Sequence, residues 1–76
     1  ISPGPMKTLS GAAIGGARKT FRFTEANTPL RANATKASIG GTAVYLASDY
    51  GECTTGETIM VDGGLHILGL PQPENF

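Results

Sequence analysis

The chain has 76 residues with six basic and six acidic side chains, and its zero net charge favours neither nucleic acid nor a membrane surface as a partner. Its one cysteine argues against a disulfide framework and a zinc site, so we expect no metal. No apolar run approaches the roughly 18 residues that span a bilayer, and no signal peptide is visible, which predicts a cytoplasmic protein.

The first residues predict the end of a strand followed by a turn. Ile1 and Ser2 fit the last residues of a strand, and Pro3-Gly4-Pro5 then bends the chain, because proline fixes φ and glycine tolerates positive φ. The sequence opens within this element rather than on a methionine. We therefore expect the chain to be a piece of a larger protein.

Residues 9–26 predict two helices. Apolar side chains recur at helical spacing along one face, at Leu9, Ala13, Ile14, Ala17 and Phe21. Each glycine within this stretch weakens a helix by about 1 kcal/mol. We expect a short mobile helix over 10–14, a firmer helix over 17–26 and a hinge at Gly15 and Gly16. A glycine-rich surface loop is the alternative.

The second half of the chain begins with a helix end and a new helix start. Asn27-Thr28-Pro29 should end the firmer helix, because the residue before a proline is pushed out of the helical region. A loop over 30–34 follows, and Thr35 is a good N-cap. Apolar residues then recur at helical spacing, which predicts the strongest helix over 36–48. They are Ile39, Ala43, Leu46, Ala47 and Tyr50.

Residues 57–61 predict the one convincing strand. The run Ile59-Met60-Val61 is apolar and mostly β-branched, and Asp62-Gly63-Gly64 after it is a turn signal. A lone strand leaves its N–H and C=O groups unpaired. We therefore expect a parallel strand from elsewhere to complete the sheet.

The remaining segments carry weaker signals. Residues 49–55 predict a loop. Residues 65–70 form a short apolar segment that we expect to pack on a partner surface. The tail over 71–76 contains two prolines and no periodicity, so we expect it to be extended and partly disordered.

The order of turn, mobile helix, firm helix, strand and Asp-Gly-Gly resembles the last part of a short-chain dehydrogenase/reductase. The stretch Thr55-Gly56-Glu57-Thr58-Ile59-Met60-Val61-Asp62-Gly63-Gly64 looks like that family's final strand, and Ser2-Pro3-Gly4-Pro5-Met6-Lys7-Thr8 looks like its Pro-Gly turn. With Thr28-Pro29-Leu30-Arg31 and Ala47-Ser48-Asp49, the chain is most similar to the NADH-dependent enoyl-acyl-carrier-protein reductases. The resemblance implies an α/β fold, with residues 1–76 as the C-terminal segment of one Rossmann-like, doubly wound parallel-sheet domain whose N-terminal two thirds are absent.

The resemblance also implies that the catalytic residues lie outside this sequence. The chain contains no glycine-rich dinucleotide fingerprint and no tyrosine followed six residues later by a lysine, the catalytic pair of the family. Tyr45 and Tyr50 lack a lysine at that spacing, so we interpret them as packing residues. His66 and Cys53 have no partner at a plausible spacing and receive no catalytic role. The fragment alone should be inactive.

By the same resemblance, the opening turn binds the cofactor NADH/NAD through Gly4, Pro5, Met6 and Thr8. The Met6 backbone N–H and C=O would hold the nicotinamide carboxamide, which needs one donor and one acceptor. The Thr8 hydroxyl would reach the pyrophosphate. The alternative for Thr8 is a cap on the next helix.

The resemblance places the substrate and the carrier protein on the segment that follows. The apolar residues Leu9, Ala13, Ile14, Ala17 and Phe21 would cover the acyl chain as a mobile lid. Arg18, Lys19 and Arg22 share one side of the firm helix and would dock the acidic surface of acyl carrier protein. A solvated helix face is the alternative for this basic cluster.

The implied function is reduction of trans-2-enoyl thioesters with NADH in bacterial type II fatty-acid synthesis, by a homotetramer whose partner is acyl carrier protein. Two alternatives stay open. One is another short-chain reductase, such as a 3-oxoacyl-acyl-carrier-protein reductase. The other is a non-catalytic dimerisation module.

Overall fold

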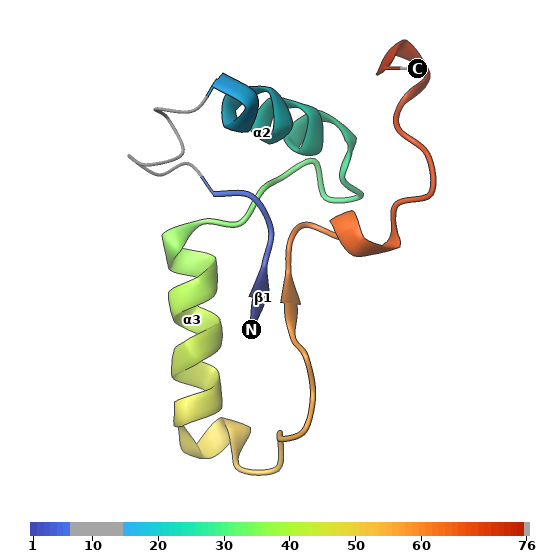
Figure 1. The fold of residues 1–76 in the computed structure, drawn as a ribbon. Helices are drawn as coiled ribbons and strands as arrows, with labels where there is room; N and C mark the ends of the chain where they lie inside the picture. Colours follow the sequence, from blue (N-terminus) through green and yellow to red (C-terminus); the bar gives the residue numbers. More distant parts are fainter. Residues whose placement is uncertain (7–14, 76) are drawn as a thin grey trace.

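The computed structural model describes residues 1–6 and 15–75 (Figure 1). In chain order its elements are strand β1 (Ser2–Pro3), helix α2 (Gly15–Asn27), helix α3 (Lys36–Ala47) and strand β2 (Met60–Val61). Short 3-10 turns lie at Asp49–Gly51, Leu65–Ile67 and Pro73–Asn75. The two strands lie side by side, with α3 next to them and α2 beyond their carboxyl ends.

The sheet consists of β1 and β2 in parallel, with Ser2 opposite Met60 and Pro3 opposite Val61. Ser2 N donates to Ile59 O at 2.8 Å, and Gly4 N donates to Val61 O at 2.9 Å. Pro3 is tolerated because alternate residues of a strand face the same neighbour, so the N–H that proline lacks would point away from β2.

Two predictions about this strand were wrong. The predicted strand over 57–61 is only two residues long, because β1 offers it a partner of only two residues. Its parallel neighbour was expected from elsewhere, yet Ser2 and Pro3 of the same chain supply it. The prediction that Ile1 and Ser2 form the end of a strand pointed to the segment that pairs with β2.

Helix α2 ends at Asn27, one residue after the predicted end, next to the predicted stop at Thr28-Pro29. The predicted hinge at Gly15 and Gly16 is wrong, because both glycines belong to the first turn of α2. A penalty of about 1 kcal/mol per glycine is small enough for the helix to continue through them. The predicted helix over 10–14 lies outside the described residues.

The interior beneath α2 is polar. Thr24, Asn27 and Thr28 are buried, whereas among the described residues Ala34 is the one buried apolar side chain. Thr24 Oγ1 donates to Asn33 Oδ1 at 2.6 Å, and Asn33 Nδ2 donates to Phe21 O at 2.8 Å. Hydrogen bonds rather than apolar packing therefore fasten the loop over residues 28–34 to α2.

Helix α3 starts from the predicted N-cap Thr35, which forms a capping box with Ser38. The helix ends at Ala47, one residue before the predicted end. None of its residues is buried, and a hollow of about 360 Å³ lies between its first turn and β2, lined among others by Ser38 and Met60. α3 therefore lacks an opposing layer within the described part of the chain.

The predicted packing role of Tyr45 and Tyr50 is not observed within the described residues. Tyr50 is 89% exposed, and Tyr45 is 42% exposed with its hydroxyl 2.8 Å from Thr54 Oγ1. The segment that reaches Tyr45 offers the polar Thr54 rather than an apolar surface, so Tyr45 is held by its hydroxyl.

The sequence predicted an extended C-terminal tail, but the tail contains a 3-10 turn. This turn, Pro73–Asn75, follows Gln72, whose backbone N–H donates to the side-chain oxygen Asn27 Oδ1 at 2.6 Å. Asn75 Nδ2 contacts the same oxygen at 3.3 Å. A buried amide oxygen needs donors, and the tail supplies them. Within the described residues, neither α2 nor α3 is long and apolar enough to cross a membrane.

Candidate functional site

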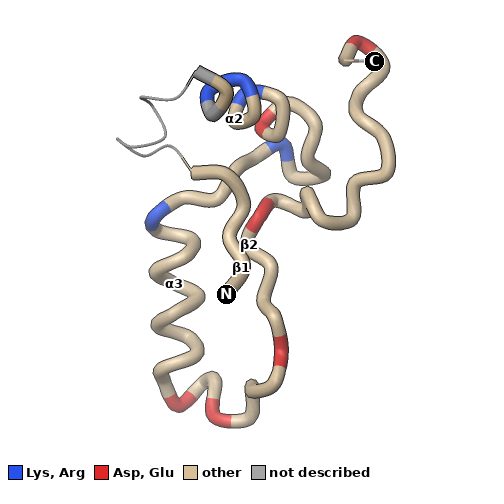
Figure 2. Tube along the Cα trace, in the orientation of Figure 1, with Lys and Arg blue, Asp and Glu red and all other residues tan. Residues whose placement is uncertain are grey.

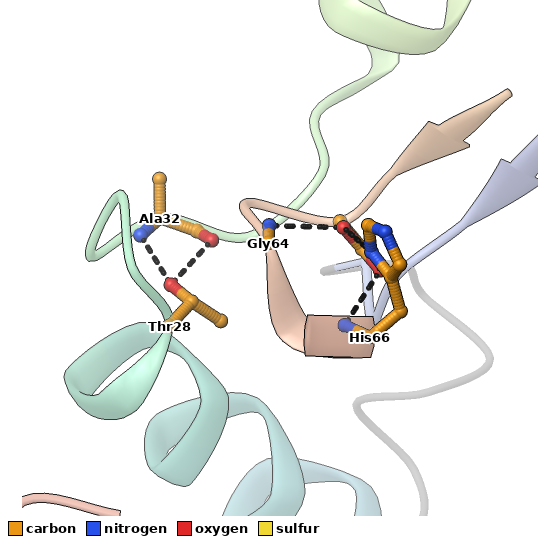
Figure 3. A network of polar contacts seen from close by, with 5 residues as sticks. Thr28, Ala32, Gly64 and His66 are labelled. Carbon is orange, nitrogen blue, oxygen red and sulfur yellow. Dashed lines mark hydrogen bonds and ion pairs between the residues drawn. The ribbon is translucent and has the colours of Figure 1, made fainter. Parts of the chain in front are cut away.

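The turn that follows β2 is organised by the Asp62 carboxylate (Figure 3). Asp62 is only 5% exposed and accepts hydrogen bonds from Gly64 N at 2.9 Å and from His66 N at 3.1 Å. Gly63 and Gly64 have φ of 67° and 94°, a left-handed region that glycine enters without strain. The Asp-Gly-Gly turn predicted from the sequence is thus a closed, carboxylate-bonded turn.

The imidazole of His66 is the side-chain partner of this carboxylate. Its Nδ1 lies 3.0 Å from Asp62 Oδ2 and 3.2 Å from Oδ1, while the His66 side chain remains 44% exposed. Burial opposes ionisation of Asp62, but the hydrogen bonds from Gly64 and His66 outweigh burial and lower the pKa of its carboxyl group. The carboxylate is therefore the stable form in the folded chain.

The prediction that His66 lacks a partner was wrong. Asp62 stands four residues before it, and the 3-10 turn Leu65–Ile67 brings the two side chains together. The spacing of a carboxylate and a histidine four residues apart across a helical turn was the signal that would have found this pair.

The two glycines of the turn lie against the loop that follows α2. Gly63 O accepts a hydrogen bond from Leu30 N at 3.0 Å, and a Cβ on Gly63 would overlap Ala32 O. A Cβ on Gly64 would lie 2.8 Å from Pro29 Cγ. Thr28 holds the same loop, because its Oγ1 accepts from Ala32 N at 3.0 Å and donates to Ala32 O at 3.1 Å (Figure 3).

The predicted cofactor turn lies on the other side of Asp62. A Cβ on Gly4 would lie 2.8 Å from Asp62 Cβ and 2.9 Å from Asp62 Cα, so only glycine lets these backbones approach. Gly4, Pro5 and Met6 are half-buried and follow the carboxyl end of β1. Ligands of open α/β sheets bind beyond that edge.

The backbone of Met6 fits a carboxamide chemically. Among the residues that the structure describes, none is hydrogen-bonded to its N–H or C=O group. One donor and one acceptor of the same residue match the acceptor and donor of a carboxamide. Thr8, the second predicted cofactor contact, lies outside the described residues.

Three of the five predicted substrate residues, Leu9, Ala13 and Ile14, also lie outside the described residues. Ala17 lies in α2, one turn before Phe21, and the Phe21 side chain is half-buried. Among the side chains of α2 that the structure describes, the buried ones are instead Thr24 and Asn27, with Thr28 directly after them. Their spacing of three and four residues marks one helix face, and that spacing was the overlooked signal.

The predicted docking residues Arg18, Lys19 and Arg22 are all exposed in α2. Figure 2 shows basic positions along this helix in blue. The ion pair found in the described part of the chain joins Asp62 and His66 and involves none of them. Over the same residues, no group of three His, Cys, Asp or Glu side chains is placed to hold a metal, and Cys53 is exposed.

The sequence of the chain is similar to those of known reductases. A family model described as enoyl-(acyl carrier protein) reductase matches residues 1–66. The NADH-dependent enoyl-[acyl-carrier-protein] reductase FabI of Bacillus cereus is 46% identical over 69 residues, which cover 91% of this chain and 27% of that protein. The chain thus spans about a quarter of the length of the relatives it matches.

Solved structures of enoyl-acyl-carrier-protein reductases superpose on the chain. The enoyl-(acyl-carrier-protein) reductase of Anaplasma phagocytophilum in complex with NAD superposes with a TM-score of 0.82 at 38% identity, covering 97% of this chain and 26% of that one. The Bacillus cereus enzyme with NADP+ and indole naphthyridinone gives 0.78 at 46% identity, covering 88% and 26%. These neighbours confirm the predicted Rossmann-like α/β class. Since the family model covers most of its length, the chain belongs to the enoyl-(acyl carrier protein) reductase family.

Proposed function

We propose that this chain is the C-terminal segment of a single-domain enoyl-acyl-carrier-protein reductase that reduces trans-2-enoyl thioesters in bacterial type II fatty-acid synthesis. Family membership supports the reaction class. The observation that carries the proposal is the contact of Gly4 with Asp62, beside the parallel pairing of β1 and β2. It sets the turn over residues 4–6 at the carboxyl edge of the sheet, where such folds bind their ligands.

The cofactor role follows from that turn. The bound nicotinamide dinucleotide supplies the hydride. Gly4 and Pro5 shape the turn, the N–H and C=O of Met6 hold the carboxamide, and the Thr8 hydroxyl donates to the pyrophosphate. Fixing the carboxamide selects the ring face that meets the substrate, which is catalysis by orientation. We propose NADH as the donor, and the related structures, one with NAD and one with NADP+, make NADPH the comparison to test.

The acyl chain is assigned to the segment after the turn. Leu9, Ala13, Ile14, Ala17 and Phe21 form the apolar cover, and the half-buried Phe21 supports that assignment within the described residues. The catalytic tyrosine and lysine come from the rest of the protein, so these 76 residues alone are inactive.

The proposed assembly is a cytoplasmic homotetramer that meets acyl carrier protein through Arg18, Lys19 and Arg22. The exposure of these three side chains on α2 supports a docking role. The exposed apolar side chains Met60, Ile67 and Leu70 near the sheet edge and the tail support burial against another subunit. We assign neither nucleic acid nor a membrane as a partner.

The decisive experiment measures dinucleotide oxidation by the full-length protein with three substrates. We expect turnover with a trans-2-enoyl thioester on acyl carrier protein and faster oxidation of NADH than of NADPH. A 3-oxoacyl thioester should give no turnover, and a saturated acyl thioester serves as the blank. Preferential turnover of the 3-oxoacyl substrate would identify the alternative reductase, and no turnover of any substrate would favour the dimerisation module.

A further inference from the structure

Asp62 lies at the junction of the two turns that the proposed function brings together. On one side, the Asp62 Cα and Cβ atoms lie against Gly4. A Cβ built on Gly4 would lie 2.9 Å from the Asp62 Cα and 2.8 Å from the Asp62 Cβ. On the other side its carboxylate closes the turn through Gly64 and His66. Any shift of the Asp62 backbone is therefore transmitted to the start of the cofactor turn.

On the side of the turn away from Gly4, Leu30 N donates to Gly63 O at 3.0 Å and Ile67 N donates to Gly64 O at 3.0 Å. Gly63 and Gly64 have no side chains and adopt φ of 67° and 94°, a region that glycine adopts without strain. Hydrogen bonds must fix this backbone, and those to the Asp62 carboxylate run through residues 64 and 66. The carboxylate can accept hydrogen bonds from both Gly64 N and His66 N only while its orientation is fixed.

His66 fixes that orientation. Its Nδ1 lies within 3.2 Å of both carboxylate oxygens, and it is the side-chain donor to Asp62 among the described residues. Donation to the carboxylate places a proton on Nδ1 and leaves Nε2 on the half-exposed side of the ring. Without the imidazole, the carboxylate keeps only its two backbone donors, Gly64 N and His66 N.

We propose that His66 is a positioning residue for dinucleotide binding, which acts through Asp62 to hold the Gly4–Met6 turn in the conformation that grips the nicotinamide carboxamide. This inference rests on the proposed function of that turn. His66 touches neither substrate nor cofactor in this scheme. Its contribution is to the affinity for the dinucleotide, and it is separate from the grip on the acyl thioester.

The test compares His66→Leu with His66→Asn in the full-length protein. Leucine removes the donor, whereas the asparagine amide has a donor nitrogen at about the position of Nδ1 and restores the hydrogen bond. We expect His66→Leu to raise the Kd of NADH, measured by fluorescence titration, by about 3- to 10-fold, the effect of one partly exposed hydrogen bond to a charged group. His66→Asn should stay within about twofold of wild type.

A purely structural role would give a different pattern. It would raise the KM of NADH and of the enoyl thioester in parallel, whereas we expect the thioester KM to change little. Ile67→Ala, in the same 3-10 turn and 69% exposed in wild type, is the matched control and should leave the Kd unchanged. Parallel KM changes, or an asparagine variant as weak as the leucine variant, would overturn the inference.

A measurement on the wild type covers the case in which His66→Leu does not fold. The imidazole resonances of His66 should shift when NADH is added, because the turn that it holds contacts the ligand-binding turn. Unchanged resonances at saturating NADH would contradict the inference. A wild type that binds neither NADH nor NADPH would overturn the proposed function and this inference together, whereas binding with equal Kd in all variants would overturn the inference alone.

Discussion

Buried polar side chains hold the described part of the chain together residue by residue. Thr24, Asn27, Thr28 and Asp62 are all at most 5% exposed, and each is hydrogen-bonded. One such bond contributes roughly 0.5–1.5 kcal/mol net, but a buried group left without its partner costs about 1–3 kcal/mol. The residues that matter most here are therefore those whose loss leaves another buried group unpaired.

Asp62 should make stability depend on pH in acid. Its pKa is lowered in the folded chain, so its contribution is complete above the ordinary aspartate pKa of about 3.9 and is lost as the pH falls through the lowered value. In the full-length protein, the difference in unfolding free energy between wild type and Asp62→Asn should be larger at about pH 5 than at about pH 3, shrinking below about pH 4. Denaturant titrations across this range measure it.

The control for this prediction is Asp49→Asn, because Asp49 is exposed. Its free-energy difference from wild type should stay small throughout. A difference for Asp62→Asn that persists unchanged at about pH 3 would show that the carboxylate is not stabilised by its hydrogen bonds.

The sequence predicted the turn residues better than their partners. Gly4 and Asp62 stood out because turn chemistry is local and depends on residue type. Asn33 did not, because its bonds to Thr24 and Phe21 depend on the path of a loop that no periodicity encodes. His66 was missed because its pairing needs the 3-10 turn that follows Gly64, and that turn has no strong sequence signal.

Among the elements, the contact between the C-terminal tail and α2 offers a clear test. Asn27 is 1% exposed, donates to Phe23 O at 2.8 Å and accepts from Gln72 N at 2.6 Å. Asn27→Leu keeps the branched shape but removes the hydrogen bonds to Phe23, Gln72 and Asn75, so it should destabilise the full-length protein by about 1–3 kcal/mol. Hydrogen exchange at the Gln72 amide should accelerate at the same time.

The matched control is Asn75→Ala, which removes only the 3.3 Å contact of an exposed side chain and should change stability by less than about 0.5 kcal/mol. Unchanged exchange at Gln72 in the Asn27→Leu protein would mean that the tail is held by other contacts.

Helix α3 depends on its N-terminal cap because Gly40 and Gly41 weaken its middle by about 1 kcal/mol each. Thr35 Oγ1 accepts from Ser38 N at 3.0 Å, and Ser38 Oγ accepts from Thr35 N at 2.9 Å. Thr35→Ala should therefore cost about 0.5–2 kcal/mol, while Thr35→Ser, which keeps the hydroxyl, should cost much less. Equal denaturant midpoints for the alanine variant and the wild type would contradict this.

Helices were predictable and the sheet was not, for a physical reason. The end of α2 at Asn27 and the cap at Thr35 follow from local chemistry, so both were confirmed. A strand is defined by its partner, and the partner of β2 lies nearly 60 positions away at Ser2 and Pro3. No local pattern reveals such a pairing.

The whole chain exposes apolar surface that an independent domain would bury. Leu30, Val44 and Tyr50 are 75%, 68% and 89% exposed, and Ala34 is the one buried apolar side chain among the described residues. Small domains are already marginal when their cores are complete. We expect the isolated 76-residue chain to show no cooperative thermal transition by circular dichroism, whereas the full-length protein does. A sharp, native-like melt of the isolated chain would contradict this.

The charge distribution over the whole molecule predicts how a carrier protein approaches. Net charge is zero, yet Arg18, Lys19 and Arg22 lie exposed within one turn of α2 (Figure 2). A basic patch of this kind acts mainly on the rate of encounter with an acidic partner and is weakened by salt. In the full-length protein, Arg18→Glu combined with Lys19→Glu should raise the KM for an enoyl thioester on acyl carrier protein by about tenfold, with the effect shrinking as salt is added.

A small thioester separates docking from folding, because it carries no acidic protein surface. Turnover of an enoyl-pantetheine substrate should stay nearly unchanged in the double variant. Lys36→Glu is the matched control, since Lys36 is equally exposed but lies on α3 rather than on the patch. Equal losses with both substrates would assign the two basic residues to the stability or movement of α2, since charge repulsion of a carrier protein cannot slow a substrate that has none.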